Sequence, residues 1–549
     1  MSKAIRDTVT GVLSRAASGF GERIFLDFSG AMHTYGEVDA LSTRLANGLL
    51  ALGVAPGDRV CTLMDTSLDA VLVWFATSKI GAVYVPINSA YKGDYLRDQI
   101  ADSGARIVLA EADYLARFEA IAAELPGLET IIVRGEGAAL HSPIGKKLVA
   151  LPEAMGSDAA IAHENRYSNI AMIIYTGGTT GPSKGCIVSH NYICNLARQF
   201  VVNGNRTADD VNWSPLPLFH LNALGSTILA SAMVGGRASL YPRFSVSNFW
   251  PEIERSGATV VNLLGSMLTF VAEQPDSEVS RRCFGQLRAV RGSPFPAPLQ
   301  EKWKDRFGVG KTGSNVYGLS EACSVTSLPD DEYAKPGSSG KRNDDFEVIL
   351  ADDYGVEVPT GEVGEILIRP RYPHIMFEGY WNRPEDTLKV MSNLWLHSGD
   401  LARFDEDGFF YFVDRKKDYL RRRGENISSF ELETTFRKHP LVEDVAVHSV
   451  FSETAEDDVK ATIVLKAEAG AESLMPEAVC GWAAERVPYY AVPRYIEFRE
   501  NLPRNPVDVC SNTFSGTKAA RPGPGIGKQP VSTSKNADGS SHWPPALYF

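Results

Sequence analysis

The sequence predicts an α/β protein with a large N-terminal domain of mixed and parallel sheets flanked by helices, followed by a small α+β C-terminal domain. Strand-like and helix-like patterns alternate through residues 23–110, which is typical of parallel βαβ units. The 549 residues exceed the length of one ordinary domain, so two or more are expected. From Pro440 to Phe498 the pattern changes to two strands, a helix and a further strand, which indicates a separate small unit.

The first elements follow from local patterns. Residues 23–28 form a strand-like run, and Thr34 with Glu37 three positions later makes a capping box that predicts a helix start. Apolar residues at helical spacing continue to about Gly53. Strands are expected at 59–64 and 81–87, with a helix at 67–80 between them.

A glycine-rich loop from Tyr175 to Gly185 follows an apolar strand expected at 169–174. The loop holds four glycines, three threonines, one serine and one lysine. Glycines allow backbone N–H groups to approach a ligand closely, hydroxyls add donors, and Lys184 adds a positive charge. It is not a Walker A motif, because no Gly-Lys-Ser/Thr follows a four-residue spacer. A phosphate-binding loop is therefore favoured over the alternative, a glycine-rich surface turn.

Composition narrows the class of protein. A net charge of −12 argues against a nucleic-acid-binding protein. The seven cysteines include no C-x-x-C pair, so we expect neither a disulfide framework nor a zinc site, as in a reduced cytoplasmic protein. No run of 18 apolar residues predicts an integral membrane segment, and Met1–Phe20 has the pattern of an amphipathic helix rather than a signal peptide.

Later motifs carry polar residues whose role the local pattern leaves open. His220, after Pro-Leu-Phe, either lines a pocket or is a packed loop histidine. Gly292-Ser293-Pro294 is by itself a turn. Ser320 and Glu321 either present a hydroxyl and a carboxylate or begin a helix. Asp400, in Ser-Gly-Asp, is by itself a turn aspartate.

Together these motifs resemble the adenylate-forming superfamily of acyl-CoA synthetases, peptide-synthetase adenylation domains and firefly luciferase. The stretch from Thr176 to Gly185 is similar to its Thr-Gly-Gly-Thr-Thr-Gly-x-x-Lys-Gly loop. Tyr317-Gly-Leu-Ser-Glu321 is similar to its Tyr-Gly-x-Thr/Ser-Glu motif, and Trp395-Leu-His-Ser-Gly-Asp400 to its Trp-x-x-Thr-Gly-Asp motif. The resemblance covers about residues 10–507 and implies the superfamily's fold and chemistry.

The resemblance implies one site for ATP and AMP. Lys184 and Ser320 would stabilise charge on the transferring phosphoryl group, and Glu321 would hold Mg²⁺, which prefers hard oxygen ligands. These three are the implied catalytic residues, and Asp400 would accept from both ribose hydroxyls. The implied nucleotide-binding residues are Thr176, Gly177, Gly178, Thr179, Thr180, Gly181, Lys184, Gly292, Ser293, Pro294, Tyr317, Gly318, Ser320, Asp400 and Arg415.

The resemblance also implies where the other substrates bind and how the chain divides. The acyl pocket would involve His220, Asn262, Gly265 and Met267, and CoA would face Arg421, Arg422, Arg423 and Gly424. The implied parts are an adenylation domain at 1–414, a hinge at 415–418 containing Lys417, a small mobile domain at 419–508 and an atypical tail at 509–549. Rotation about the hinge would present one face of the small domain to each half-reaction.

The chain departs from the family after Val507. The family continues with glycine and lysine, and that lysine contacts the acyl carboxylate and the α-phosphate; this chain continues Asp508-Val-Cys-Ser-Asn. The glycine-, proline- and serine-rich tail has the composition of a disordered segment. One hypothesis is a shifted reading frame, since codons for 507–514 exist whose shifted frame gives Gly-Arg-Val-Leu-Lys-Tyr. Sequencing the gene tests it.

The implied activity is ligation of a carboxylic acid to CoA, with ATP converted to AMP and diphosphate through an acyl-adenylate. Tyr411-Phe-Val-Asp-Arg415 and Arg423-Gly-Glu-Asn-Ile-Ser428 look most like the carnitine/crotonobetaine-CoA ligase branch, so the expected acid is carnitine-like, medium-chain or otherwise hydrophobic. Two alternatives remain: an enzyme that adenylates an acid for a carrier protein, and a nucleotide-binding pseudo-enzyme without the C-terminal lysine. A homodimer is possible on general grounds.

Overall fold

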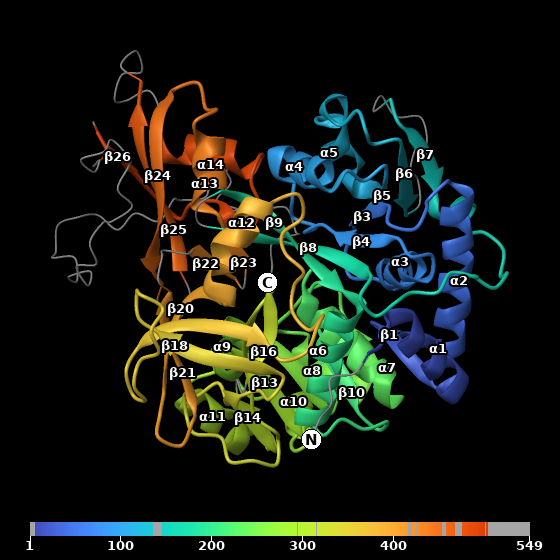
Figure 1. The fold of residues 1–549 in the computed structure, drawn as a ribbon, viewed down its shortest axis with the longest axis horizontal. Helices are drawn as coiled ribbons and strands as arrows, with labels where there is room; N and C mark the ends of the chain where they lie inside the picture. The colour runs from blue at the N-terminus through green and yellow to red at the C-terminus, as the bar shows by residue number, and fades with distance from the viewer. Residues whose placement is uncertain are drawn as a thin grey trace.

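The structure, a computed structural model, describes most of the chain (Figure 1). The described residues are 6–135, 145–178, 181–293, 295–313, 316–415, 420–423, 425–452, 457–466, 475–499 and 501–502. The expected tail at 509–549 and the hinge lysine, Lys417, lie outside these ranges. No helix in the described ranges is both long and apolar enough to cross a membrane.

The first large sheet has seven strands in the order β14-β13-β12-β10-β11-β1-β2. Its strands pair in parallel except for β1 and β2, which form an antiparallel hairpin. The N-terminal strand β1 lies between β2 and β11, with Leu26 opposite Ala238. The bounds are β1 (Ile24–Phe28), β2 (Ala31–Thr34), β10 (Val211–Ser214), β11 (Arg237–Leu240), β12 (Val260–Leu264), β13 (Ala289–Ser293) and β14 (Lys311–Gly313).

The second large sheet also has seven strands, in the order β7-β6-β5-β3-β4-β8-β9. It is parallel except at one edge, where β8 and β9 pair antiparallel. The bounds are β3 (Arg59–Leu63), β4 (Val83–Pro86), β5 (Ile107–Glu111), β6 (Thr130–Arg134), β7 (Lys147–Ala150), β8 (Ile170–Gly178) and β9 (Gly181–Ser189).

One apolar core is shared by the two large sheets and the helices between them. It joins Phe25 of β1, Tyr84 of β4 and Met172 of β8 to side chains of α1, α2, α3 and α6, all of them buried. Further helices cover the outer face of the first sheet, where Trp213, Phe249 and Trp303 form a second aromatic core. The helices of this domain are α1 (Val9–Phe20), α2 (Tyr35–Ala51), α3 (Leu68–Lys79), α4 (Gly93–Ser103), α5 (Leu115–Glu119), α6 (His190–Asn203), α7 (Ala230–Val234), α8 (Phe249–Ser256), α9 (Gly265–Glu273), α10 (Glu278–Arg282), α11 (Ala297–Phe307) and α12 (Pro384–Val390).

Two smaller antiparallel sheets complete the large domain, β15-β16-β17 and β18-β19-β20-β21. They follow the parallel strands in the sequence and carry the later motifs. Their bounds are β15 (Val316–Leu319), β16 (Ala322–Ser327), β17 (Lys341–Arg342), β18 (Phe346–Ala351), β19 (Gly364–Pro370), β20 (Leu396–Phe404) and β21 (Phe410–Arg415). A π-helix at Ala223–Leu229 and short 3₁₀ turns at Ala112–Tyr114, Ala122–Glu124, Leu151–Ala154 and Ser392–Leu394 connect these elements.

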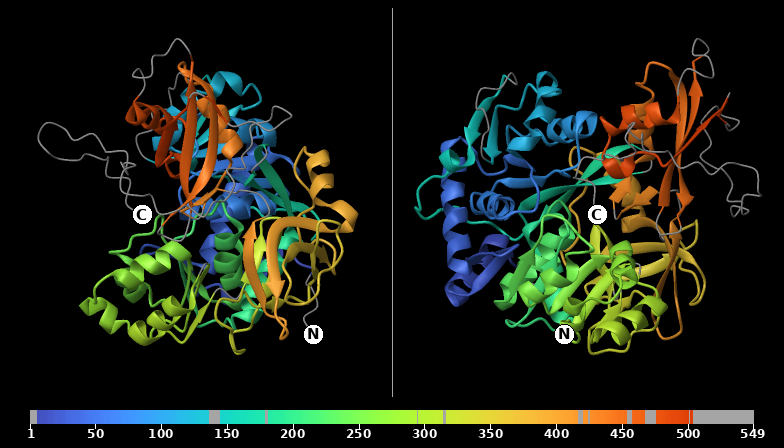
Figure 2. Two further views of the ribbon diagram at one scale, coloured as in Figure 1. Left: turned by 90° about the vertical axis from the view of Figure 1, so that its left-hand side faces the viewer. Right: turned by 180° about the vertical axis from the view of Figure 1, so that it is seen from behind.

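The small C-terminal domain consists of a hairpin, a three-stranded sheet and two helices. It packs beside α4 and the edge of the second large sheet, as Figures 1 and 2 show. Buried apolar residues continue from that sheet into the small domain, where Leu420, Ile427 and Leu432 join the cluster. Its elements are β22 (Leu420–Arg422), β23 (Glu425–Ile427), α13 (Ser429–Phe436), β24 (Val442–Phe451), β25 (Asp457–Leu465), α14 (Pro476–Ala484), a 3₁₀ turn (Tyr489–Ala491) and β26 (Tyr495–Phe498).

The predicted α/β class and the small second unit are confirmed. Thr34 accepts the backbone N–H of Glu37 while Glu37 accepts that of Thr34, so the predicted capping box is present. One local expectation differs from the structure. The loop expected after residue 174 is a β-hairpin, because β8 continues to Gly178 and β9 begins at Gly181. The ladder extends because the backbone groups of Tyr175 and Thr176 pair with Gly185 and Lys184 across the hairpin.

Candidate active site

The glycine-rich loop is the tip of the β8–β9 hairpin. Gly185 is required by the packing, because a Cβ there would lie 2.6 Å from Cγ2 of Ile173. The hydroxyl of Thr176 lies 3.5 Å from the carbonyl of Lys184 across the ladder. Gly177, Gly178 and Gly181 are described as backbone of the two strands, while Thr179 and Thr180 lie outside the described residues.

Lys184 and Glu321 lie on either side of one tyrosine. The ammonium of Lys184 is 5.3 Å from the ring centroid of Tyr380, within the range of a cation–π contact, and 3.8 Å from Oδ1 of Asp386. The hydroxyl of the same tyrosine donates a 2.6 Å hydrogen bond to Oε1 of Glu321. Glu321 is 9% exposed. Tyr380 therefore holds a cation and a carboxylate, the charges needed around a phosphoryl group and its metal, in one place.

The donor set around Glu321 fits magnesium. In the part of the chain that the structure describes, no three histidine, cysteine, aspartate or glutamate side chains come together as a metal cluster. Magnesium is usually bound by one or two carboxylates together with substrate phosphates and waters. A single buried carboxylate near the glycine-rich hairpin has that character, whereas a structural zinc site needs about four protein ligands.

Tyr317 and Asp400 join the β15–β16 turn to β20. The hydroxyl of Tyr317 donates a 2.6 Å hydrogen bond to Oδ2 of Asp400, which is 8% exposed. The Tyr317 ring lies against Phe410, with ring centroids 4.9 Å apart. Asp400 is opposite Arg415 in the β20–β21 ladder, which brings two residues expected to bind the nucleotide next to each other along the backbone. Of Arg415 only the backbone is described.

Two of the other expected nucleotide contacts are glycines in strands, Gly318 in β15 and Gly292 in β13, where a side chain does not fit. A Cβ at Gly318 would be 2.6 Å from the backbone nitrogen of Ser324, and one at Gly292 would be 2.6 Å from the carbonyl of Leu263. The Ser320 carbonyl accepts from the Tyr192 hydroxyl at 2.9 Å, which anchors the turn. Ser293 is described only as backbone of β13, and Pro294 lies outside the described residues.

The expected acyl residues come from three elements. His220 ends a turn before the π-helix and is 41% exposed at its side chain. Asn262 of β12 is 5% exposed; its Nδ2 is 3.5 Å from Oγ of Ser226, and its Oδ1 is buried without a hydrogen-bond partner. Gly265 and Met267 begin α9 directly after β12. Such an unpartnered buried acceptor calls for an explanation, and an unbound substrate group is one.

The small domain reaches into this region. Both carboxylate oxygens of Glu425 lie near Nε2 of His220, at 3.3 and 3.2 Å. Nδ2 of Asn88 lies 3.4 Å from Oε2 of Glu425 and donates to the Tyr490 hydroxyl at 2.9 Å. Lys92 donates to the carbonyl of Ala484. The β22–β23 hairpin thus contacts His220, one of the residues expected at the acyl pocket.

The expected CoA residues differ in their surroundings. Arg422 is directed into the small domain, where it pairs with Asp458 at 3.3 Å and donates to the Val492 carbonyl at 2.8 Å. Arg423 is exposed and its guanidinium lies 5.6 Å from the Tyr489 ring centroid. The side chain of Arg421 is not among the described parts, and Gly424 lies outside the described residues. The assignment of these residues to CoA stays a prediction.

The cysteines near the site are protonated thiols. Burial, with Glu321 nearby, raises the pKa of the Cys186 thiol well above its ordinary value. Burial also raises the pKa of Cys323 to about 12. Both thiols therefore remain un-ionised near neutral pH and are poor nucleophiles, which agrees with a structural role.

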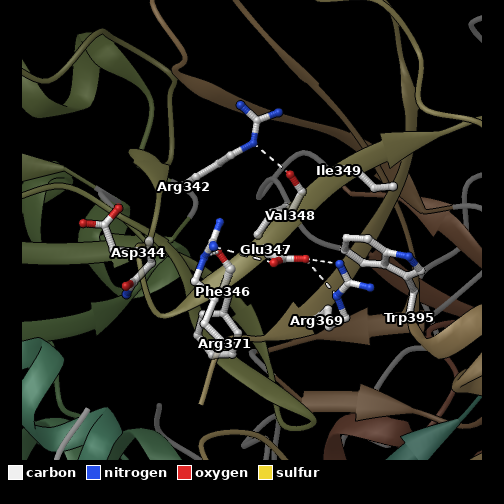
Figure 3. A pocket seen from close by; sticks show the side chains of 10 residues that line it. Arg342, Asp344, Phe346, Glu347, Val348, Ile349, Arg369, Arg371 and Trp395 are labelled. Carbon is white, nitrogen blue, oxygen red and sulfur yellow. Dashed lines mark hydrogen bonds and ion pairs between the residues drawn. The ribbon is translucent and has the colours of Figure 1, made fainter. Parts of the chain in front are cut away.

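A surface groove of about 680 Å³ lies elsewhere, on β18 and β19 (Figure 3). Its arginines are already engaged: Arg369 pairs with Glu347 and lies 4.4 Å from the Trp395 ring, and Arg342 donates to the Val348 carbonyl at 2.8 Å. None of the expected site residues lines this groove. The groove is therefore separate from the residues expected to bind the nucleotide.

Several residues of the site escape sequence reasoning. Tyr380 holds Glu321 across 59 positions of sequence. Glu365 accepts the backbone N–H of Gly399 at 3.1 Å, beside Asp400. Ser183 is contacted by Glu431 from 248 positions away. The Gly379-Tyr-Trp381 segment is visible in the sequence as a loop, but its contact with Glu321 depends on the tertiary fold.

Comparison with known families gives two matches. A family model described as "AMP-binding enzyme" matches residues 13–381. A second, described as "AMP-binding enzyme C-terminal domain", matches residues 431–507. The first match includes Lys184, Tyr317 and Glu321 and the second includes most of the small domain, while Asp400 and Arg415 lie between the two matches.

Curated relatives and solved structures agree with these matches. A feruloyl-CoA synthase from Amycolatopsis sp is 31% identical over 476 residues, covering 86% of this chain and 91% of the relative. A crotonobetaine/carnitine–CoA ligase from Citrobacter koseri is 29% identical over 480 residues, covering 86% and 90%.

Among solved structures, a double mutant of o-succinylbenzoate CoA synthetase from Bacillus subtilis, bound with a product analogue, is 26% identical with a TM-score of 0.78, covering 92% of this chain and 98% of that chain. ATP-bound MatB from Rhodopseudomonas palustris is also 26% identical, with a TM-score of 0.66 and coverage of 91% and 96%.

Proposed function

The chain belongs to the AMP-binding enzyme family of AMP-forming CoA ligases, and from that membership we propose that it ligates a hydrophobic carboxylic acid to CoA through an acyl-adenylate, with ATP as the second substrate. The observation that carries the proposal is the contact of Tyr380 with both Lys184 and Glu321. It brings the ammonium of Lys184 and the carboxyl group of Glu321, which would bind the phosphates and hold Mg²⁺, onto one side chain.

In the first half-reaction a carboxylate oxygen of the acid attacks the α-phosphorus of ATP, and pyrophosphate leaves. Negative charge grows on the phosphoryl oxygens, so pre-arranged donors and cations lower the barrier. Lys184 and the N–H groups of the hairpin tip would bind the phosphates, and the Ser320 hydroxyl would bind the α-phosphate. Glu321 would hold Mg²⁺, which would neutralise negative charge of the phosphates.

The nucleoside would be held by Tyr317 and Asp400. A carboxylate can accept from two ribose hydroxyls at once, and the ring of Tyr317 offers a face for the adenine. The hydrogen bond between the two side chains, 2.6 Å long, fixes their relative position before ATP binds. This pre-organisation reduces the ordering required on binding.

In the second half-reaction the CoA thiol attacks the acyl-adenylate and AMP leaves. Glu425 of the β22–β23 hairpin contacts His220. This contact supports a role of the small domain near the acyl carbonyl. The exposed Arg423 supplies a forked cation suited to a phosphate of CoA. Because the attacking thiol belongs to CoA, the reaction needs no protein nucleophile. This agrees with the protonated thiols of Cys186 and Cys323.

The acid would lie among His220, Asn262, Gly265 and Met267. The buried, unpartnered Oδ1 of Asn262 favours an acid whose hydrophobic body carries a hydrogen-bond donor, because an unsatisfied buried acceptor disfavours a purely apolar occupant. Hydroxylated aromatic acids such as ferulate meet this condition. A carnitine-type acid would in addition need an anionic or aromatic partner for its quaternary ammonium.

The test is pyrophosphate release from ATP across a panel of carboxylic acids, with and without CoA. The panel includes ferulate, cinnamate, crotonobetaine and medium-chain fatty acids, and mass spectrometry detects the CoA thioester. We expect release with at least one acid and thioester only when CoA is present. Ferulate preferred over cinnamate, with Asn262→Leu removing the preference, would support the role of Asn262. No release with any acid while ATP still binds would contradict the ligase.

A second candidate rests on the sequence after Val507, which lacks the family's glycine–lysine pair. It is a chain that binds ATP but adenylates slowly. A version with a frame-restored C-terminus, assayed beside the chain as given, separates the two. Equal release by both versions favours the ligase, and release only by the restored version favours the second candidate.

A further inference from the structure

Glu431, in the first turn of α13, reaches out of the small domain into the phosphate loop. Its Oε1 accepts the backbone N–H of Ser183 at 2.6 Å and the hydroxyl of Ser183 at 2.8 Å. Ser183 lies between the hairpin tip and Lys184 and is 9% exposed. Two of the donors that this loop offers to a phosphate are thus occupied by one carboxyl oxygen.

The local helix does not explain this orientation. Ser428 and Glu431 have the Ser-x-x-Glu spacing of a capping box, and Ser428 does accept the N–H of Glu431 at 3.2 Å. In a capping box the glutamate turns back to the N-cap backbone. Here Oε1 of Glu431 accepts hydrogen bonds from Ser183 across the domain interface, so the contact links the two domains.

The surroundings do not favour a carboxylate there for stability alone. Burial, with Asp98 nearby, raises the pKa of Glu431 to about 7. Tyr91 and Tyr95 of the large domain also lie close enough to interact with it. An acid placed in a costly environment, against a loop built for anions, has the character of a functional contact.

The donors of Ser183 can serve Glu431 or a phosphate oxygen, but not both at full strength. A phosphate in the loop would also bring negative charge against the carboxyl group. Binding of a phosphate to Ser183 and binding of Glu431 to Ser183 therefore compete, and the contact of Glu431 links the small domain to the hairpin.

We propose that Glu431 is a positioning residue that takes the place of a phosphate oxygen in the loop once pyrophosphate has left, and so holds the small domain in the orientation seen here. The inference rests on the proposed ligase function. In this orientation Glu425 lies against His220, at the acyl side of the site. Departure of pyrophosphate would then allow the small domain to adopt this orientation, here called the seated state, for attack by the CoA thiol.

The experiment measures binding of inorganic pyrophosphate by calorimetry and the seating of the small domain by hydrogen exchange. The amides at 88–92 and 484–490 report the seating, because Asn88 contacts Tyr490 and Lys92 contacts Ala484. The variants are Glu431→Ala, which removes the acceptor, and Glu431→Gln, which keeps it. The matched control is Glu477→Ala, which alters an exposed first-turn glutamate of α14.

We expect pyrophosphate to bind Glu431→Ala roughly tenfold more tightly than the wild type, since a competing pair of hydrogen bonds to an acid is gone. In the wild type, pyrophosphate should accelerate exchange at 88–92 and 484–490. In Glu431→Ala these amides should exchange quickly without ligand, whereas Glu431→Gln should remain protected until pyrophosphate is added. The Glu477→Ala control should match the wild type.

Equal pyrophosphate affinity in the wild type and Glu431→Ala would overturn the proposal, as would unchanged protection of the two segments. Failure of pyrophosphate to bind either protein would overturn it as well. This measurement needs neither a carboxylic acid nor turnover. A protein that ligates none of the tested acids would fail in the pyrophosphate-release assay, whereas failure of the present proposal would be seen in the calorimetry and hydrogen exchange. The two failures are therefore distinguishable. Comparison with Glu431→Gln, which retains an oxygen acceptor, separates lost competition from misfolding.

Discussion

The hydroxyl of Tyr380 lies 2.6 Å from Oε1 of Glu321 and donates a hydrogen bond to it. The ring of the same residue faces the ammonium of Lys184. One side chain thus sets the position of the carboxylate with its hydroxyl and supports the cation with its ring. The two functions can be separated by removing the hydroxyl alone.

Tyr380→Phe should weaken the response to Mg²⁺ while leaving Lys184 in place. A lost hydrogen bond to a charged group is worth about 1.5–3 kcal/mol, so the Mg²⁺ concentration for half-maximal pyrophosphate release should rise about tenfold or more. Tyr411→Phe, which removes a hydroxyl bonded to Asp405 at 3.2 Å, is the control. An unchanged Mg²⁺ titration would show that Tyr380 does not act through Glu321.

Asp400→Asn should reduce the affinity for ATP but not for pyrophosphate. The amide keeps the size of the side chain but offers one acceptor oxygen where the carboxylate offers two. We expect the KM for ATP to rise by roughly one order of magnitude. Inorganic pyrophosphate has no ribose and serves as the internal control, so parallel loss of both ligands would contradict the assignment.

Gly318→Ala should damage the β15–β16 turn. The new Cβ would lie 2.6 Å from the backbone nitrogen of Ser324, and overpacking of this kind costs about 1–3 kcal/mol. Since the turn carries Ser320 and Glu321, pyrophosphate release should fall further than the melting temperature indicates. Gly19→Ala in α1, where nothing lies within 4 Å of the new Cβ, should be neutral or slightly stabilising.

Seating of the small domain should strengthen as the pH falls. The pKa of Glu431 is about 7 in the seated arrangement, against an ordinary value of 4.5, so between these two values the seated state binds more protons than the released state. Lowering the pH from 7.5 to 6 should therefore raise the protection factors of the amides at 88–92 several-fold, after correction for the intrinsic pH dependence of amide exchange, and raising the pH above 7 should have no further effect through this group.

The groups that face Glu431 are Ser183, Tyr91, Tyr95 and Asp98, and His220 contacts Glu425 in the same interface. The comparison with Glu431→Gln isolates the contribution of Glu431, since the amide does not titrate. A pH dependence that persists unchanged in Glu431→Gln would show that it does not come from Glu431.

The sequence predicts the scaffold well, because its signals are local. The Thr34–Glu37 capping box and the apolar runs of β3 and β4 depend on neighbours within a few positions. The hairpin at Tyr175–Gly185 is less accessible to prediction. Glycine and threonine carry no hydrophobic alternation, so nothing in the local pattern indicates that the ladder continues to Gly178 and Gly181.

The site is predicted only in part, for a different reason. The motifs bring Lys184, Glu321 and Asp400 to attention one by one, but the side chains that hold them are contributed by distant segments. Tyr380 and Glu431 are ordinary residues of a loop and a helix start in the sequence. Their contacts exist only after the antiparallel sheets and the small domain have packed against β8 and β9.

Because β1 lies between β2 and β11, the two large sheets differ in when they can form during synthesis on the ribosome. Every strand of the second large sheet lies between Arg59 and Ser189, so that sheet can close as one contiguous stretch emerges. Strand β1 must wait for Arg237–Leu240, which at a synthesis rate of 5–20 residues per second takes about 10–40 s. During that time one edge of the β1–β2 hairpin is unpaired and open to chaperones.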